Sequence, residues 1–162
     1  METSTDSLLT LARAGEDALA AGRHEDAAQY LAAAIKLAPS SEDLFFNLGL
    51  AQLRGGHAHD ACKSFERALE LGGEKADLLC NLGLALFEQG KLTEAEAWLS
   101  RALVLEPGHP EAANNLGVIM FRRGQYEQAQ TLFARALEHR SNYEDARINL
   151  RDTLAELNGN KP

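Results

Sequence analysis

Apolar residues recur along this chain with the spacing of amphipathic α-helices, and no segment alternates apolar and polar residues as a β-strand would. In residues 42–75, Phe45 and Leu48 lie on one helix face, and Phe65 and Leu69 lie on a second. A Gly-Gly-His sequence separates the two faces. The segment is therefore predicted to fold as a helix, a turn and a second helix, and the chain as an all-α protein.

The same pattern returns every 34 residues. Four windows of that length cover residues 8–41, 42–75, 76–109 and 110–143. Small and large apolar residues hold fixed positions in every window. These positions are Ala27, Ala61, Ala95 and Ala129; Leu31, Phe65, Leu99 and Phe133; and Ala34, Ala68, Ala102 and Ala136. One period kept over four windows predicts a repeat protein in which helix pairs stack on their neighbours.

Eight of the thirteen glycines occupy two of the repeated positions. The first position follows the first helix of each pair, where a left-handed residue commonly ends a helix; it holds Gly22, Gly56, Gly90 and Gly124. The second lies inside the first helices; it holds Gly15, Gly49, Gly83 and Gly117. A glycine inside a helix costs about 1 kcal/mol relative to alanine. We expect close packing of the second helix against the first to offset that cost.

Residues 144–157 continue the period without completing another helix pair. Arg151 stands where the windows have their first-helix glycine. Because a second helix could not pack against that charged face, this segment is predicted to be a single capping helix that ends the array. Residues 1–7 and 158–162 are expected to form flexible tails.

These positions resemble the tetratricopeptide repeat, whose 34-residue unit carries a Leu-Gly pair, a turn glycine, two alanines and a late proline. The third window has them all: Leu82-Gly83, Gly90, Ala95, Ala102 and Pro107. The first window departs from the pattern with Ala14 before its glycine, and Gly73 and Ser141 replace the proline in the second and fourth. The resemblance covers residues 8–143. It implies four repeats in a right-handed solenoid, with the first helices lining a concave surface that is the usual binding face.

An asparagine precedes the Leu-Gly position in three windows and in the capping segment. These residues are Asn47, Asn81, Asn115 and Asn149, whereas Arg13 takes the place in the first window. An asparagine side chain both donates and accepts hydrogen bonds, so it can pair with any peptide backbone. The set resembles the asparagine ladder in the repeat region of O-linked N-acetylglucosamine transferase. That resemblance implies that the four residues hold an extended peptide, but asparagine is common here throughout the family, so a structural role is the alternative.

Two further sets of residues belong to the predicted groove. The candidates for apolar contact with a ligand are Phe46, Leu50 and Leu84, whereas Leu53, Phe87 and Phe121 are expected to pack in the core. Acidic residues begin successive first helices; they are Asp43, Asp77, Glu111 and Asp145. They would favour a ligand that carries Lys or Arg. Acidic residues in a first turn also stabilise the helix dipole, which explains them without a ligand.

Composition and charge narrow the class of protein. The chain has 162 residues, of which 45% are hydrophobic and 25% charged, as in ordinary globular proteins. Its formal net charge of −8 argues against nucleic acid or an anionic membrane as the partner. No apolar run approaches the roughly 18 residues of a membrane-spanning helix. We therefore expect a cytoplasmic protein without membrane insertion.

The sequence offers little catalytic or metal-binding chemistry. Cys62 and Cys80 are too few for a disulfide framework and are expected to be packed, reduced thiols. His57 and His59 lie near Cys62, but three possible ligands at one turn fall short of the four that zinc usually takes. No catalytic motif is present. The chain is predicted to be a non-enzyme without a metal or cofactor.

These observations favour a non-enzymatic scaffold for protein–protein interaction, which binds an extended peptide segment of a partner in its concave groove. One alternative is a self-assembling structural module that forms a homodimer through Leu8, Leu9 and Leu11 of the uncapped first helix. Another alternative is a targeting subunit of an enzyme encoded elsewhere.

Overall fold

The computed structural model describes residues 4–159, and these residues form nine α-helices and no strand. The helices are α1 (Ser4–Ala20), α2 (His24–Leu37), α3 (Glu42–Arg54), α4 (Ala58–Gly72), α5 (Ala76–Glu88), α6 (Leu92–Leu105), α7 (Pro110–Arg122), α8 (Tyr126–His139) and α9 (Glu144–Gly159). Each helix packs mainly against its neighbours in sequence. The predicted all-α solenoid of helix pairs is confirmed.

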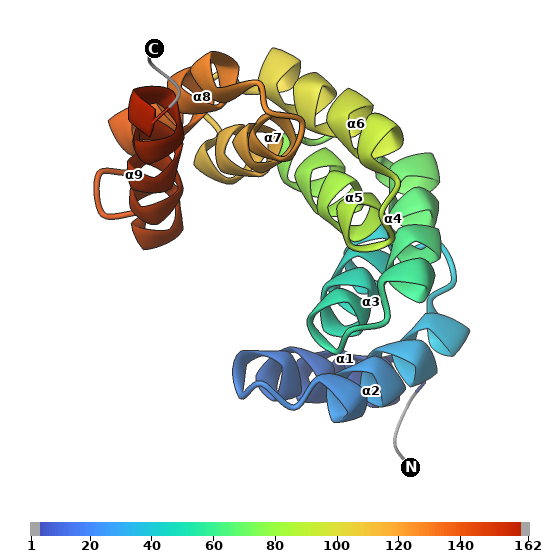
Figure 1. Ribbon diagram of the computed structural model, residues 1–162. Helices are drawn as coiled ribbons and strands as arrows, with labels where there is room; N and C mark the ends of the chain where they lie inside the picture. The colour runs from blue at the N-terminus through green and yellow to red at the C-terminus, as the bar shows by residue number, and fades with distance from the viewer. Residues whose placement is uncertain (1–3, 160–162) are drawn as a thin grey trace.

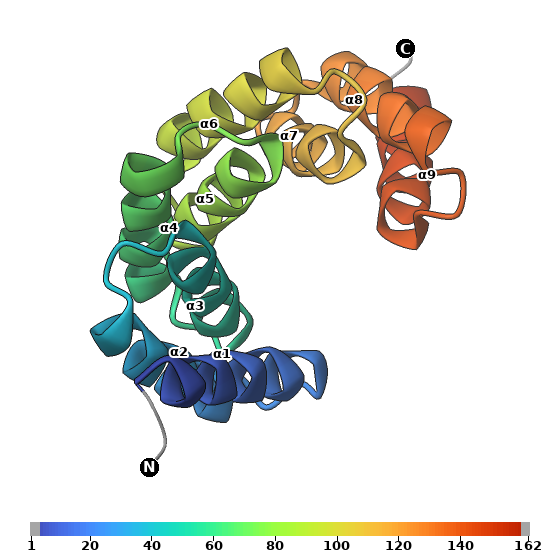
Figure 2. The same ribbon diagram turned by 180° about the vertical axis from the view of Figure 1, so that it is seen from behind.

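The helix pairs follow one another along an open arc. Figure 1 shows α3, α5 and α7 on the inner side of the arc and α4, α6 and α8 on its outer side. The view from behind in Figure 2 shows the same two layers, with α1 and α2 at one end of the arc and α9 at the other. Contacts between alternate helices join α1 to α3, α3 to α5, α5 to α7 and α7 to α9. The inner surface is therefore formed by the first helices of the pairs.

The turn glycines adopt the predicted left-handed conformation, with φ of +82° at Gly56 and +76° at Gly90. After α3, the Gly56 amide donates to the carbonyl of Leu53 at 3.0 Å, and the His57 amide donates to that of Gln52 at 2.8 Å. These two bonds form a Schellman motif, which satisfies carbonyl groups that the helix end leaves free. Because a side chain at this φ would be strained, glycine ends the first helix of each pair.

The glycines inside the first helices allow close packing of the second helices through a large side chain. A methyl group on Gly49 would lie 2.5 Å from Cε1 of Phe65, and one on Gly117 would lie 2.6 Å from Cε1 of Phe133. The space beside each glycine is thus filled by a large apolar side chain of the second helix, and at Gly83 the Ala95 carbonyl oxygen also lies 3.3 Å from the added carbon. The glycine position and the Leu or Phe position opposite it form one packing unit.

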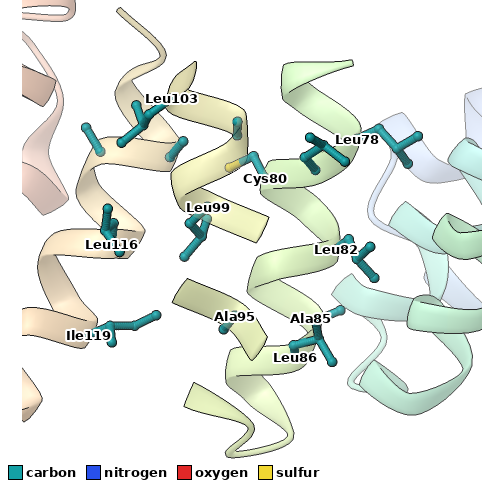
Figure 3. Close-up of a cluster of buried hydrophobic side chains, with 14 of the residues drawn as sticks. Leu78, Cys80, Leu82, Ala85, Leu86, Ala95, Leu99, Leu103, Leu116 and Ile119 are labelled. Atoms are coloured by element: carbon teal, nitrogen blue, oxygen red, sulfur yellow. The ribbon is translucent and has the colours of Figure 1, made fainter. Parts of the chain in front are cut away.

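The core extends along the arc between the two layers. A large cluster of buried residues runs from α4 to α9, and a smaller one joins α1, α2 and α3. Figure 3 shows part of the large cluster, with Leu78 and Leu82 along one side of α5 and Leu99 of α6 on the other side of that helix. Leu78, Leu82 and Leu99 are each at most 1% exposed. Each pair therefore depends on its neighbours for burial, as stacked repeats do.

Two boundaries differ from the sequence prediction. Residues 4–7, which we expected in a flexible tail, form the first turn of α1, and α9 extends beyond residue 157 to Gly159. The acidic residue Asp6 lies in the first turn of α1, where its negative charge interacts favourably with the helix dipole. The outermost parts of both predicted tails, residues 1–3 and 160–162, lie outside the described residues.

The face of α1 that corresponds to the buried face of α3 is polar. In α3, Leu44, Leu48 and Ala51 pack against the preceding helix pair. The equivalent residues of α1 are Thr10, Ala14 and Asp17, and Thr10 and Asp17 are exposed. This face of α1 therefore lacks the apolar surface that stacking of another pair would require.

No helix within residues 4–159 is long and apolar enough to cross a membrane.

Candidate functional site

The inner helices share an arrangement of side chains in three rows, which we name here. The acidic row is Asp43, Asp77, Glu111 and Asp145; the amide row is Asn47, Asn81, Asn115 and Asn149; and the apolar row is Leu50, Leu84 and Val118. Along each helix the amide follows the acidic residue by four positions and precedes the apolar residue by three. At 1.5 Å per residue, these steps are about 6 Å and 4.5 Å along the helix axis. The amide row therefore runs between a charged row and an apolar row.

The first half of the amide row keeps much of its hydrogen-bonding capacity. The Asn81 amide nitrogen donates to the Asp77 carbonyl of its own helix at 2.8 Å. The Asn47 amide nitrogen lies 3.5 Å from Oε1 of Glu16 on α1. Both asparagines are partly exposed, and within residues 4–159 the side-chain oxygen of neither has a hydrogen-bond partner. These two residues are therefore free to accept a hydrogen bond from a ligand.

The second half of the amide row belongs to a network inside the protein. The Asn149 amide donates to Oδ1 of Asn114 at 3.0 Å, and the Asn114 amide donates to Oδ1 of Asn115 at 3.4 Å. The Asn115 amide in turn faces the Cys80 sulfur at 3.9 Å. Burial raises the pKa of the Cys80 thiol to about 12, and nearby Glu111 adds to the effect. This network connects α9, α7 and α5, so it supports the structural alternative for Asn115 and Asn149.

Asn114 is the residue of this network that sequence reasoning missed. It is only 5% exposed and occupies the repeat position held by Phe46 in α3 and Cys80 in α5. The sequence signal for a special role of Asn114 is that it is polar at a position where α3 and α5 have Phe46 and Cys80. Its role depends on the partner from α9, which the repeat pattern alone does not identify.

Part of the acidic row is paired within the chain. His109 is buried and precedes α7; its Nε2 lies 3.0 Å from Oδ1 of Asp77, and its Nδ1 accepts from the Ala112 amide at 3.2 Å. The Glu111 carboxylate lies 2.5 Å from Nη1 of Arg140. Asp43 is exposed. The free negative charge of this row therefore lies at α9, where Asp145 is exposed, and at α3 and α5, where the Asp77 side chain is 79% exposed despite its contact with His109.

Two cavities open along the seam between α3 and α5. The larger has a volume of about 440 Å³. Apolar residues, one basic and one acidic side chain, and one asparagine line it: Leu50, Leu53, Arg54, Gly56, Ala58, Asn81, Leu84 and Glu88. The smaller, about 160 Å³, lies nearer the helix N-termini and is lined by Glu42, Asp43, Phe46, Lys75, Asp77 and Leu78. The structure thus gathers six of the sequence-predicted residues around one seam. Leu53, expected in the core, both packs against the core and lines the larger cavity.

Asn47 lies on α3 but lines neither cavity, and the other predicted residues lie apart from this seam. Asn149 lines a small cavity of about 70 Å³ with Phe121 and Val118. The Arg122 guanidinium lies 4.3 Å from the centre of the Phe87 ring. Glu111 and Asn115 are held by the contacts described above, so the α5–α7 seam has fewer free polar groups than the α3–α5 seam.

Within residues 4–159, no three His, Cys, Asp or Glu side chains are placed to hold a metal ion. Near His57 and His59, the Cys62 sulfur accepts a hydrogen bond from the Gln89 amide at 3.0 Å. Cys62 is buried, and burial raises the pKa of its thiol. These features describe a packed thiol rather than a reactive one.

Two family models described as tetratricopeptide repeat match the sequence. One matches residues 13–61 and 46–110, and the other matches residues 86–151. The chain belongs to the tetratricopeptide repeat family. Repeats of this kind stack into extended surfaces that bind other proteins, so membership supports a role as a protein–protein interaction scaffold. Family members are generally non-catalytic interaction modules.

Solved structures of other proteins share the fold. The MamA protein is 18% identical, with a TM-score of 0.79 over 95% of this chain and 84% of that chain. The pilF protein of Pseudomonas aeruginosa is 24% identical, with a TM-score of 0.82 over 98% of this chain and 72% of that chain. YrrB, described as a protein of this family with an unusual peptide-binding site, is 23% identical to this chain. Its TM-score is 0.73 over 99% of this chain and 86% of that chain. No curated protein sequence matches this chain significantly.

Proposed function

We propose that this tetratricopeptide repeat protein holds an extended segment of a partner protein along the inner surface of the arc. Asn47 and Asn81 pair with the peptide backbone in this proposal, and Leu50 and Leu84 contact its side chains. The observation that carries the proposal is Asn81, which lines the 440 Å³ cavity and has a side-chain oxygen without a partner in the described part of the chain. A partly exposed amide beside an apolar cavity suits peptide recognition, because the amide fixes the backbone while the cavity receives a side chain.

The spacing of the helices fits an extended ligand. Packed helices lie about 10 Å apart, and an extended strand rises about 3.3 Å per residue. Neighbouring asparagines would therefore meet every third residue of the peptide. Asn47 and Asn81 would hold residues i and i+3, and two ligand residues would lie over the seam between them. The peptide-binding site named for YrrB gives a precedent for peptide binding by a protein of the same fold.

The test is a binding measurement on a defined peptide. The tightest binder from a library of random nine-residue peptides displayed on phage, selected on the full chain, is synthesised with a fluorescent label. Fluorescence anisotropy then gives its affinity for the wild type and for the double variant Asn47→Ala, Asn81→Ala. Loss of one or two hydrogen bonds to the backbone, at about 1–3 kcal/mol in total, predicts affinity about 5- to 150-fold weaker.

A matched control separates this effect from a general loss of amide groups. Gln29 and Gln128 are exposed residues of α2 and α8. The double variant Gln29→Ala, Gln128→Ala should bind like the wild type. Equal affinity of the wild type and the asparagine double variant, with unchanged helix content by circular dichroism, would contradict the proposal.

Self-association through α1 is a second candidate, favoured by one observation. Leu9 is 63% exposed, whereas Leu8 and Leu11 pack partly against the smaller core cluster. If α1 pairs with another copy, the sedimentation coefficient should rise with protein concentration, and Leu9→Ser should abolish that rise. A monomer at all concentrations excludes this candidate.

A further inference from the structure

The seam between α3 and α5 differs in chemistry on the two sides of the amide row. On one side is the smaller cavity, with Asp43 and Asp77 at its edge and Phe46 and Leu78 among its lining. On the other side is the larger cavity, with Leu50, Leu53 and Leu84. Asn81 lies between Asp77 and Leu84 on α5, one turn from the first and nearly one turn from the second. A ligand backbone on the amide row would therefore have an acidic pocket on one side and an apolar pocket on the other.

The charge of the smaller cavity is not cancelled by its own lysine. Lys75 Nζ lies 2.6 Å and 2.7 Å from the two carboxylate oxygens of Glu42, so this pair is neutral as a unit. The carboxylates of Asp43 and Asp77 remain, and Nε2 of the buried His109 lies 3.0 Å from Oδ1 of Asp77. Apolar surface beneath two carboxylates suits a Lys or Arg side chain, because its aliphatic stem packs against the apolar part while its charged end reaches the carboxylates.

The larger cavity suits a neutral side chain. Arg54 and Glu88 carry opposite charges at its lining, so they leave no net charge, and three leucines are among the residues that line it. An apolar side chain buried there would gain the free energy of removing its surface from water. A charged side chain would meet one charge of each sign there, so the cavity favours neither sign.

Successive side chains of an extended strand point to opposite sides of the strand. If Asn47 and Asn81 hold residues three apart, two adjacent ligand residues lie over the α3–α5 seam, one directed to each cavity. We propose that this seam selects an extended peptide in which a Lys or Arg lies directly beside a large apolar residue. This inference rests on the proposed function and adds the chemistry of the ligand to it. The net charge of −8 would also attract a basic peptide at long range.

The phage library of random nine-residue peptides tests this specificity. Selections are run in parallel on the full-length wild type and on the variant Asn47→Ala, Asn81→Ala. The expected result is enrichment, on the wild type only, of peptides with Lys or Arg next to Leu, Ile, Met or Phe. If the wild type enriches peptides that lack this pair of residues, and the asparagine variant does not enrich them, this inference is overturned and the proposed function stands. Equal enrichment, or none, on both proteins would overturn both.

A charge reversal with a matched control measures the acidic side directly. Asp43→Lys and Glu127→Lys make the same charge change at exposed residues in the first turn of a helix, but Asp43 lies on inner α3 and Glu127 on outer α8 (Figure 1). Asp43→Lys should weaken binding of the selected basic peptide about fivefold to tenfold at low salt, and Glu127→Lys should change it less than twofold. A peptide with the basic residue replaced by Ser should bind the wild type and Asp43→Lys equally. Equal effects of the two reversals on the basic peptide would contradict the assignment.

Discussion

Substitution of Gly49 by alanine tests how the helix pairs are packed. The added methyl group would lie 2.5, 2.7 and 2.9 Å from three carbons of the Phe65 ring, which are closer than van der Waals contact allows. Phe65 is fully buried and its ring also lies 5.9 Å from that of Phe46, so it has no open space to move into. Alanine gains about 1 kcal/mol of helix propensity, but overpacking of a core costs about 1–3 kcal/mol. The expected net change is a loss of up to about 2 kcal/mol in the free energy of unfolding.

The assay is urea unfolding followed by circular dichroism at 222 nm. Because stacked repeats can unfold in parts, the midpoints of the transitions are compared rather than extrapolated free energies. Gly159→Ala is the control, since a methyl group there would meet nothing within 4 Å. In a Phe65→Val background, which removes the clashing ring, Gly49→Ala should no longer lower the midpoint. A midpoint for Gly49→Ala above that of the wild type would refute the packing argument.

Three further predictions concern the polar groups beneath the inner surface. His109→Ala removes the side-chain cap of α7 and the contact with Asp77, and should lower the free energy of unfolding by about 1–2 kcal/mol in urea titrations; no change would contradict the capping role. Asn114→Ala leaves the amide groups on either side of it unpaired and should lower stability by about 1–3 kcal/mol, while the affinity for the selected peptide changes less than twofold. Burial raises the pKa of the Cys80 thiol from 9.0 to about 12, so the unfolded state loses this proton first as pH rises. The contribution of Cys80 to stability is complete below pH 9 and is lost as pH approaches 12, and a variant Cys80→Ala should show a shallower decline in urea midpoint between pH 9 and 11 than the wild type.

The repeat pattern was enough to predict the helix pairs, because each pair must present the same faces to its neighbours. The turn glycines follow from one backbone requirement and were predicted correctly. The inner glycines needed the structure, since sequence spacing shows that Gly49 and Phe65 recur together but not that the ring occupies the space of a missing Cβ. Similarly, the helical start at Ser4 lies outside the repeated windows, so the period carried no information about it.

The candidate site was predicted only in part. Sequence position identified the amide row, but whether each asparagine is free depends on contacts between helices. Asn115 and Asn149 are tied to Asn114, which holds a position that is apolar in α3. His109 offered a local signal, because it directly precedes Pro110 at the first position of α7, where a capping residue is expected. The two cavities depend on the sizes of side chains from two helices, and no single repeated position shows them.

The most direct test of the peptide-binding account is to observe the asparagine side chains themselves. In a nitrogen-15 correlation spectrum, the side-chain amide signals are assigned by comparison with the single variants Asn47→Ala and Asn81→Ala, and the selected nine-residue peptide is then added to saturation. The account predicts large shifts of the Asn47 and Asn81 side-chain signals, with smaller shifts for Asn115 and Asn149. Shifts confined to residues of α4, α6 and α8 on the outer side of the arc would contradict it.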